Sequence, residues 1–407
     1  MGTDMGTVLL SETREPSPCL KDRDGGRCIE KDKIWIKTRM QSGGSRQLVK
    51  EHEKKKKVLQ DLSKEELLEF VLSIGMPKFR AGQIFRWLGR GVSSIDDMTD
   101  LSLISRSLIK EKSMLCTVEI FKKFTSAIDG TIKYLFSFDD GNIIEGVFME
   151  YKHGYSVCIS SQVGCRMGCV FCASTPGGWV RNLTAGEMLG QITAIMKDTG
   201  KKPGSIVIMG IGEPFDNYSQ VISFIKTAHD PEYFDIGYRH FTISTCGLVP
   251  GILKLANENI PINLSISLHS PEDVQRAEMM PIARTWSIDK TIEACKIYTE
   301  ATGRRVTFEY ALIASANDST DNANKLAKRL SGVLCHVNLI PLNKVEGTTF
   351  RQSDRDSMQT FLTILESRGI PATVRRELGS DVAAACGQLR RSSKAPSGEN
   401  DSGIHLT

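Results

Sequence analysis

Three cysteines within eight residues constrain this chain more than any other feature of its sequence. Cys165, Cys169 and Cys172 follow the spacing C-x3-C-x2-C. Thiolates this close together can bind one soft metal centre from a single loop. A structural zinc site usually takes four protein ligands, and no histidine follows nearby to supply the fourth. Three thiolates on a four-iron cluster would leave one iron open to a small ligand, which indicates a catalyst rather than a simple electron carrier.

From residue 155 onward, strand-like and helix-like segments alternate. Short apolar stretches typical of strands lie at 155–162, 205–210, 240–245, 262–268, 305–313 and 335–341. Helical periodicity occupies the intervals near 184–198, 217–228, 250–259, 287–301, 320–331 and 354–368. Six βα units predict a parallel sheet, whose functional loops gather at the carboxyl ends of its strands. The three-cysteine loop follows the first strand, so we expect it at that edge.

Two smaller regions precede this α/β core, which we assign to residues 155–390. Residues 58–115 predict a helical domain that begins with a capping box, Ser63 with Glu66, and has Phe79 among its inward residues. Its basic outer face predicts either RNA contact or a merely solvated surface. Residues 116–154 predict a β-hairpin extension, because apolar strands flank the turn sequence Asp-Asp-Gly-Asn.

The two ends of the chain, 1–57 and 391–407, read as polar disordered segments. The first closes with four lysines, so an RNA-attracting arm or an organelle-targeting segment are alternatives, although its acidic residues weaken the targeting reading. No run of about 18 apolar residues predicts a membrane span. Eleven cysteines, an odd and scattered number, favour a reducing compartment, and we expect a cytoplasmic protein. The net charge of +4 permits a nucleic-acid partner without requiring one.

The cysteine spacing, with Phe171 before the last thiol, resembles the radical S-adenosylmethionine (SAM) enzymes. Further stretches narrow the resemblance to the dual-specificity 23S rRNA/tRNA adenine C2 methyltransferases. These stretches are Lys78–Ile84, Cys158–Cys165, Gly178–Thr184, Met209–Pro214, Ser265–His269 and Ala383–Leu389. The resemblance covers about residues 58–391. It implies a partial (βα)6 TIM-type radical SAM barrel with a small helical domain and a short β extension.

The resemblance also implies a role for each site residue. Cys165, Cys169 and Cys172 would bind a [4Fe-4S] cluster, whose free iron chelates SAM for cleavage to a 5′-deoxyadenosyl radical. The expected SAM contacts are Gly212, Glu213, Ser244, Ser267, Leu268, His269 and Asn343.

Three residues outside the cluster carry the methyl transfer in this family. Cys386 would take a methyl group from one SAM and, after a second SAM gives the radical, link its methylene to C2 of the adenine. Cys158 would release the product by forming a transient disulfide with Cys386. Glu145 would be the proton acceptor, although its place in an apolar strand also suits an outward-facing position. The remaining cysteines Cys116, Cys246, Cys295 and Cys335 read as small buried apolar residues.

The implied partners are 23S rRNA at adenosine 2503, tRNAs at adenosine 37, and an electron donor such as flavodoxin or ferredoxin, and we expect a monomer. Arg181, Arg375 and Arg376 are candidate RNA phosphate contacts. Two alternatives stay open. One is C8 methylation of the same rRNA adenosine, the antibiotic-resistance type; the other is a non-catalytic RNA-binding protein with a structural zinc.

Overall fold

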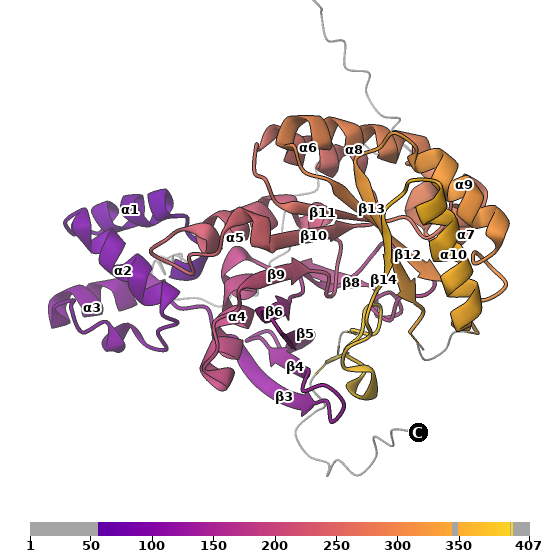
Figure 1. Ribbon diagram of the computed structural model, residues 1–407. Coiled ribbons are helices and arrows are strands. Elements are labelled where there is room, and N and C mark those ends of the chain that lie inside the picture. The colour runs from indigo at the N-terminus through magenta and orange to yellow at the C-terminus, as the bar shows by residue number, and fades with distance from the viewer. Residues whose placement is uncertain (1–55, 344–348, 391, 394–407) are drawn as a thin grey trace, which may run out of the picture. The chain divides into compact units, whose positions relative to one another are not determined.

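The computed structural model describes residues 56–343, 349–390 and 392–393 (Figure 1). The predicted amino-terminal tail, with its targeting and RNA-arm alternatives, lies outside the described residues except for Lys56 and Lys57. The predicted carboxyl-terminal tail does so except for Ser392 and Ser393, which form the short strand β15 and pair antiparallel with β5 (Asn142–Tyr151).

The first described region is helical and has a core of its own. It contains α1 (Lys64–Ser73), α2 (Phe79–Gly89) and α3 (Leu103–Lys112), with the short parallel pair β1 (Lys57–Val58) and β2 (Ser113–Met114). The predicted capping box is confirmed, since Ser63 and Glu66 exchange both hydrogen bonds. Phe79 was wrongly expected to face inward: it lies in the first turn of α2 and is 59% exposed.

An antiparallel hairpin lies between this helical region and the parallel core in the sequence, and it belongs to the main sheet. Strands β3 (Glu119–Thr125), β4 (Ile132–Ser137) and β5 pair antiparallel in sequence order, which confirms the predicted hairpin. Strand β5 then pairs antiparallel with β6 (Gly154–Cys158), so the extension and the core share one sheet.

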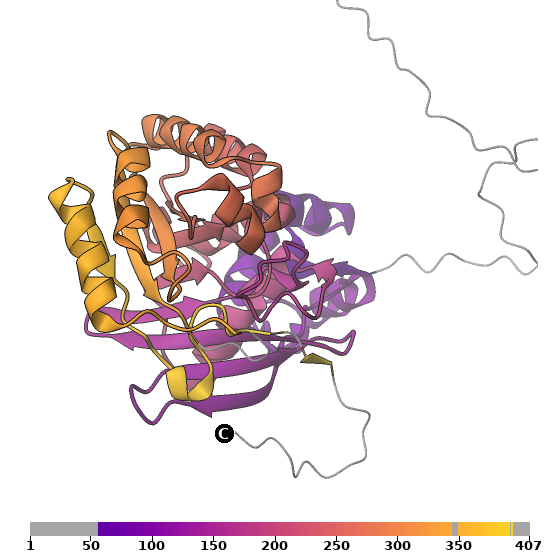
Figure 2. The ribbon, with the colours of Figure 1, turned by 90° about the vertical axis from the view of Figure 1, so that its right-hand side faces the viewer.

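The core is a run of parallel strands in the order β6, β9 (Ser205–Ile208), β10 (Phe241–Thr245), β11 (Asn263–Ser267), β12 (Val306–Leu312), β13 (Cys335–Pro341) and β14 (Ala372–Val374). The helices that connect them are α4 (Ala185–Thr199), α5 (Tyr218–His229), α6 (Val249–Asn257), α7 (Asp273–Met279), α8 (Ile288–Thr302), α9 (Thr320–Leu330) and α10 (Arg355–Ser367). Figure 2 shows the later helices on the outside of the curved strands. Six βα units followed by β14 confirm the predicted α/β partial barrel.

Two local features differ from the expectation. The predicted strand 155–162 is divided, because β6 ends at Cys158 and residues 162–164 instead form β7 (Gln162–Gly164), which pairs with β8 (Trp179–Asn182). The short helix α7 and strand β14 were not predicted, since each is too short for its periodicity to be read. No helix in the described part of the chain is long and apolar enough to cross a membrane.

Candidate active site

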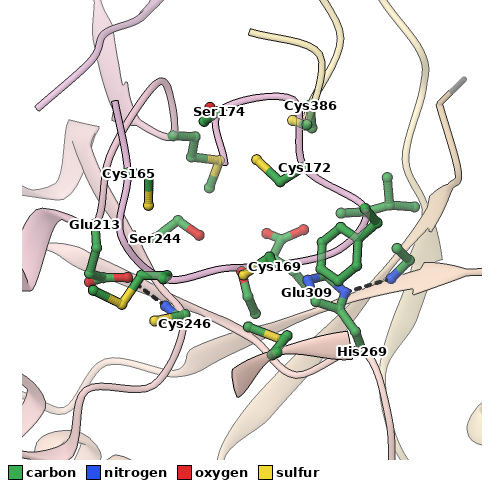
Figure 3. Close-up of a pocket in the computed structure, with 18 of the residues that line it drawn as sticks. Cys165, Cys169, Cys172, Ser174, Glu213, Ser244, Cys246, His269, Glu309 and Cys386 are labelled. Carbon is green, nitrogen blue, oxygen red and sulfur yellow. Dashed lines mark hydrogen bonds between the residues drawn. The ribbon is translucent and has the colours of Figure 1, made fainter. Parts of the chain in front are cut away.

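An open cavity lies at the carboxyl ends of the parallel strands; its empty volume, including space open to solvent, is about 1010 Å³. Strand ends and the loops after them supply one side of its wall, including Gly212 and Glu213 after β9, Ser244 to Cys246 at β10, Ser267 and His269 at β11, and Glu309 on β12. The β7–β8 loop supplies the three predicted cluster cysteines on another side (Figure 3). The structure therefore brings most of the predicted site residues together at the expected edge.

The cysteine loop is closed at its base by the pairing of β7 with β8. Gly164 has φ 76°, and a Cβ atom at this position would lie 1.8 Å from the carbonyl oxygen of Gly178. Only glycine fits so close an approach. Within the loop, the Cys172 N–H and the Thr175 hydroxyl both donate to the carbonyl oxygen of Cys169, which curls the thiol-bearing residues around the cavity.

The donor set fits a cluster better than a single ion. Burial raises the pKa of the Cys165 thiol to about 12 and also raises that of Cys169, so ionising them requires a compensating cationic centre. Among the described residues, no three His, Cys, Asp or Glu side chains converge on a point suited to one metal ion. Three thiols spread around an open cavity suit a centre in which each binds a different iron. A [4Fe-4S] cluster held by Cys165, Cys169 and Cys172 meets both requirements.

Glu213 presents a fixed, buried carboxylate to the same cavity. Its two oxygens accept the N–H groups of Phe215, at 3.0 Å, and Cys246, at 2.8 Å. Burial raises its pKa, so a cationic ligand group in the cavity would be needed to favour the charged form fully. Gly212 before it has φ 109°, and a Cβ there would meet the Gln162 side chain at 2.6 Å. This strand end therefore holds the Glu213 carboxylate in one place on the cavity wall, where it could receive a cationic group such as an ammonium.

The remaining predicted SAM residues take different positions. Ser244, Ser267 and Asn343 line the cavity, whereas Leu268 is fully buried beneath it and does not. His269 also lines the cavity, and its Nδ1 accepts the N–H of Ala311 at 2.9 Å. Burial lowers the pKa of His269 to about 3, so the ring is neutral with its proton on Nε2.

A second, adjoining cavity is lined by the two outer cysteines; its empty volume, including space open to solvent, is about 580 Å³. Cys158, at the end of β6, lines this cavity, and Cys386 lines both cavities. Both are free thiols, as are all the cysteines in the described residues. Burial raises the pKa of Cys158 to about 12. The chain thus places two thiols from distant parts of the sequence around one space that opens to the cluster loop.

The loop that carries Cys386 is held from several directions. The Asn343 side-chain amide donates to the Cys386 carbonyl oxygen at 3.0 Å. From the cluster loop, the Ala173 N–H donates to the Gly387 carbonyl at 2.8 Å and the Ser174 hydroxyl to the Leu389 carbonyl at 2.7 Å. These bonds tie the Cys386 loop directly to the cysteine loop.

Glu145 lies outside both cavities. Its carboxylate is 3% exposed, pairs with Lys133 Nζ at 3.0 Å and accepts the Arg390 N–H at 3.0 Å. Burial raises its pKa. Lys133 Nζ also donates to the Ala383 carbonyl oxygen at 3.2 Å, so the ion pair is hydrogen-bonded to the loop that carries Cys386. The outward-facing alternative for Glu145 is wrong.

Sequence reasoning missed three cavity residues. Glu309 is a buried carboxylate that accepts from the Asn338 amide at 2.8 Å, and its charge within an otherwise apolar strand was the available signal. Cys246 is buried as expected but also lines the cavity. Arg375 lines both cavities, although it was assigned to RNA phosphate. Arg181, assigned likewise, is bound to the carboxylates of Asp140 and Glu187.

Comparison with known proteins agrees with this geometry. The Radical SAM superfamily model matches residues 159–326, and the model of the ribosomal RNA large subunit methyltransferase N-terminal domain matches residues 58–115. A probable dual-specificity RNA methyltransferase RlmN from Alkaliphilus metalliredigens is 52% identical over 333 residues, which is 82% of this chain and 95% of that protein. The similarly named protein from Clostridioides difficile is 48% identical over 342 residues, 84% of this chain and 100% of the relative.

A solved structure extends the comparison to three dimensions. The crystal structure of a radical SAM methyltransferase from Sphaerobacter thermophilus superposes with a TM-score of 0.78 at 44% identity, covering 82% of this chain and 99% of the other. The two family models match the helical region and much of the barrel, and the relatives and this structure each cover 82–84% of the chain. The chain therefore belongs to the radical SAM superfamily and, within it, to the dual-specificity RNA methyltransferase family RlmN.

Proposed function

We propose that this enzyme methylates C2 of adenosine in RNA, at position 2503 of 23S rRNA and position 37 of tRNAs. The observation that carries the proposal is the position of Cys386, which lines both the cluster cavity and the cavity that contains Cys158. A sulfur at this junction can receive a group on one side and exchange with a second thiol on the other. The two relatives described above are named dual-specificity RNA methyltransferases, which supports methylation of two kinds of RNA.

The target atom explains why radical chemistry is needed. C2 of adenine is electron-poor, so it does not attack the methyl group of SAM by ordinary displacement, whereas a carbon radical can add to it. When bound, the cluster and SAM supply a one-electron reductive cleavage that creates a strong hydrogen-atom acceptor in the cavity. Every other step is assigned to side chains of the chain itself.

The cavity walls divide the binding roles. Cys165, Cys169 and Cys172 hold the cluster. Glu213, beside Gly212, receives the SAM ammonium group, because its carboxylate is fixed by two N–H donors and faces the cavity.

The other strand ends receive the rest of SAM. Ser244, Ser267 and His269 line the strand-end wall, and Leu268 supports the last two from beneath. Asn343 borders the adenosine part while its side-chain amide fixes the Cys386 loop.

Cys386 acts first as a nucleophile and then as a carrier. Its sulfur takes a methyl group from one SAM, the S-methyl group loses a hydrogen atom, and the resulting methylene radical adds to C2. The covalent adduct then gives up one electron, which the oxidised cluster would accept, and the C2 proton, for which Glu145 is the proposed acceptor because burial raises its pKa. The Lys133 ion pair has to open for Glu145 to take this proton.

Cys158 completes the turnover. Its thiolate attacks the sulfur of Cys386, the S–S bond forms, and the bond from sulfur to the methylene carbon breaks with its electron pair on carbon. That carbon takes a proton and becomes the methyl group of the product. The two thiols are oxidised to a disulfide, so a reductant has to regenerate them. Two SAM molecules are consumed in each cycle.

The proposal extends to partners. An electron donor such as flavodoxin or ferredoxin supplies the reducing electron, and the helical region 58–115 contacts RNA. The enzyme works as a monomer in the cytoplasm, with the target base unpaired or turned out of its helix.

The test is anaerobic reconstitution with iron and sulfide, followed by assay on a 23S rRNA fragment and on tRNA. We expect about four irons per chain and 2-methyladenosine in both RNAs by nucleoside mass spectrometry. Formation of 8-methyladenosine alone would contradict the position of methylation. A folded, colourless protein that binds one zinc would contradict the radical mechanism as a whole.

A further inference from the structure

Arg375 occupies the junction between the two cavities. It directly follows β14, and its N–H donates to the Leu339 carbonyl oxygen at 2.8 Å, which fixes its backbone to the edge of the parallel sheet. Its side chain is 27% exposed and lines both cavities. Nη1 lies 3.8 Å from Glu309 Oε2 and 3.9 Å from Met209 Sδ. The guanidinium is therefore held inside the site rather than extended to solvent.

The charges around this guanidinium point to the sulfur of Cys386. The pKa of Arg375 is raised, first by the nearby Cys386 sulfur and then by Glu309 and Cys158, against the opposing effect of burial. Arg375 is the one Lys or Arg among the described residues that line the cluster cavity, where Glu213 and Glu309 place negative charge. Without a cation, a thiolate in this setting would be strongly disfavoured.

We propose that Arg375 is a positioning residue for methyl transfer to Cys386: its guanidinium holds the sulfur as an anion at the junction of the two cavities, and Glu309 anchors the guanidinium. This inference rests on the proposed function. Arginine suits the role because its planar group stays charged and can contact a carboxylate and a sulfur at once.

The assisted step is balanced without a further reagent. The Cys386 thiol loses its proton to water in the open cavity, and the sulfur attacks the methyl carbon of SAM. The bond from Cys386 sulfur to carbon forms. The bond from carbon to the sulfonium sulfur breaks, and its electron pair stays on the departing thioether. The positive charge of Arg375 stabilises the anion before the attack.

The experiment isolates this first half-reaction by omitting RNA. Reconstituted wild type and the variants Arg375→Gln, Arg375→Lys and Arg376→Gln are given SAM, and S-methylation of Cys386 is followed by peptide mass spectrometry. Arg376 is the matched control, because it neighbours Arg375, is exposed and lines only the second cavity. We expect Arg375→Gln to slow methylation about 10- to 100-fold, the range for losing a bond to a charged group. Arg375→Lys should recover most of the rate, and Arg376→Gln should match wild type.

Two further measurements separate the role from general damage. The Kd for SAM should stay within about threefold of wild type in Arg375→Gln, because the proposed role of Arg375 is toward the Cys386 sulfur and the variant leaves Glu213 unchanged. In cluster-free protein, alkylation of Cys386 by iodoacetamide should slow about tenfold in the same variant. If Arg375→Gln does not fold, Glu309→Gln provides the test, since it removes the anchor and should slow S-methylation while the lysine variant stays active.

The outcomes that overturn the inference are distinct from those that overturn the function. Wild-type S-methylation by Arg375→Gln, together with a raised KM for RNA, would make Arg375 a phosphate contact instead. Equal slowing by Gln and Lys, with weaker SAM binding in both, would make it a structural residue. Absence of S-methyl-Cys386 in the wild type would contradict the proposed function itself.

Discussion

The strand-end wall and the Cys386 loop face each other across the same site but are built in different ways. The wall consists of residues in or just after consecutive parallel strands, and its Glu213 carboxylate is fixed by the backbone N–H groups of Phe215, in the same loop, and Cys246, after the next strand. The Cys386 loop instead depends on partners far away in the sequence: Lys133, Ala173, Ser174 and Asn343. The wall is therefore fixed by the strands that carry it. The position of the Cys386 loop depends instead on a few separate contacts with other segments of the chain.

The sharpest test of this division compares a cysteine from each side. Cys169→Ser should lose iron, SAM cleavage and all methylation. Cys386→Ala should keep iron and SAM binding but lose RNA methylation by at least about 1000-fold, because the covalent carrier is gone. Iron analysis, visible absorbance and nucleoside mass spectrometry distinguish the two. Loss of iron from Cys386→Ala would show that the two sides are not separable.

Cys158→Ala addresses the second half of the loop's chemistry. With no thiol to attack the sulfur of Cys386, the covalent adduct with RNA should accumulate, and free product should fall about 100-fold. A denaturing gel with labelled RNA detects the adduct as a slowly migrating band. The double variant Cys158→Ala/Cys386→Ala is the control and should give no band. An equal, adduct-free loss in both single variants would contradict the sequential roles.

Lys133→Met should remove the ion pair with Glu145 and the hydrogen bond to Ala383 that hold the Cys386 loop. It leaves the Glu145 carboxylate buried without its cation, which we expect to cost about 3–5 kcal/mol of unfolding free energy. The matched double variant Lys133→Met/Glu145→Leu removes both charges and should recover most of that loss. Urea denaturation of cluster-free protein measures both. If the single and double variants are equally unstable, packing rather than charge holds the loop.

His269 offers a smaller, pH-dependent probe of the wall. Its pKa is about 3 in the folded protein against an ordinary 6.5, so the unfolded chain binds the proton first as pH falls. The unfolding free energy should therefore be fully present above pH 6.5. It should decline below that value by about 1.4 kcal/mol per pH unit from this residue. His269→Asn keeps an acceptor for the Ala311 N–H and should lack this part of the slope. An unchanged slope would assign the pH dependence to other groups.

The contrast between the strand-end wall and the Cys386 loop also explains which features could be predicted from the sequence. The C-x3-C-x2-C spacing, the βα alternation and the edge at which the loops gather depend on neighbouring residues, and the structure has them as expected. At the end of β11, Ser267 and His269 reach the cavity while Leu268 does not. His269 follows the strand with φ 56°, so alternation along an extended chain does not by itself predict where its side chain lies. The family resemblance predicted SAM contact for all three residues and did not distinguish between them.

Contacts between distant residues could not be read in the same way. Nothing near Glu145 in the sequence indicates that Lys133 and Arg390 enclose its carboxylate. Arg375 and Arg376 look equivalent in sequence, yet one points into the site and the other is exposed. The burial of these side chains and the residues they contact depend on how distant segments, such as β14 and β13, pack together. The local periodicity of the sequence does not predict that packing.

The place of the Cys386 segment in the sheet has a mechanical consequence. The segment runs from β14, at one end of the parallel strands, to β15, which pairs with β5 beyond the other end (Figure 2). It therefore spans the side on which the barrel strands do not pair with one another. A small shift of its middle would leave every strand pairing intact and would change only the separate hydrogen bonds that hold the loop, such as those from Asn343, Ala173 and Ser174. In the proposed mechanism, such a shift would let the Cys386 sulfur serve SAM, the RNA base and Cys158 in turn without a change in the barrel.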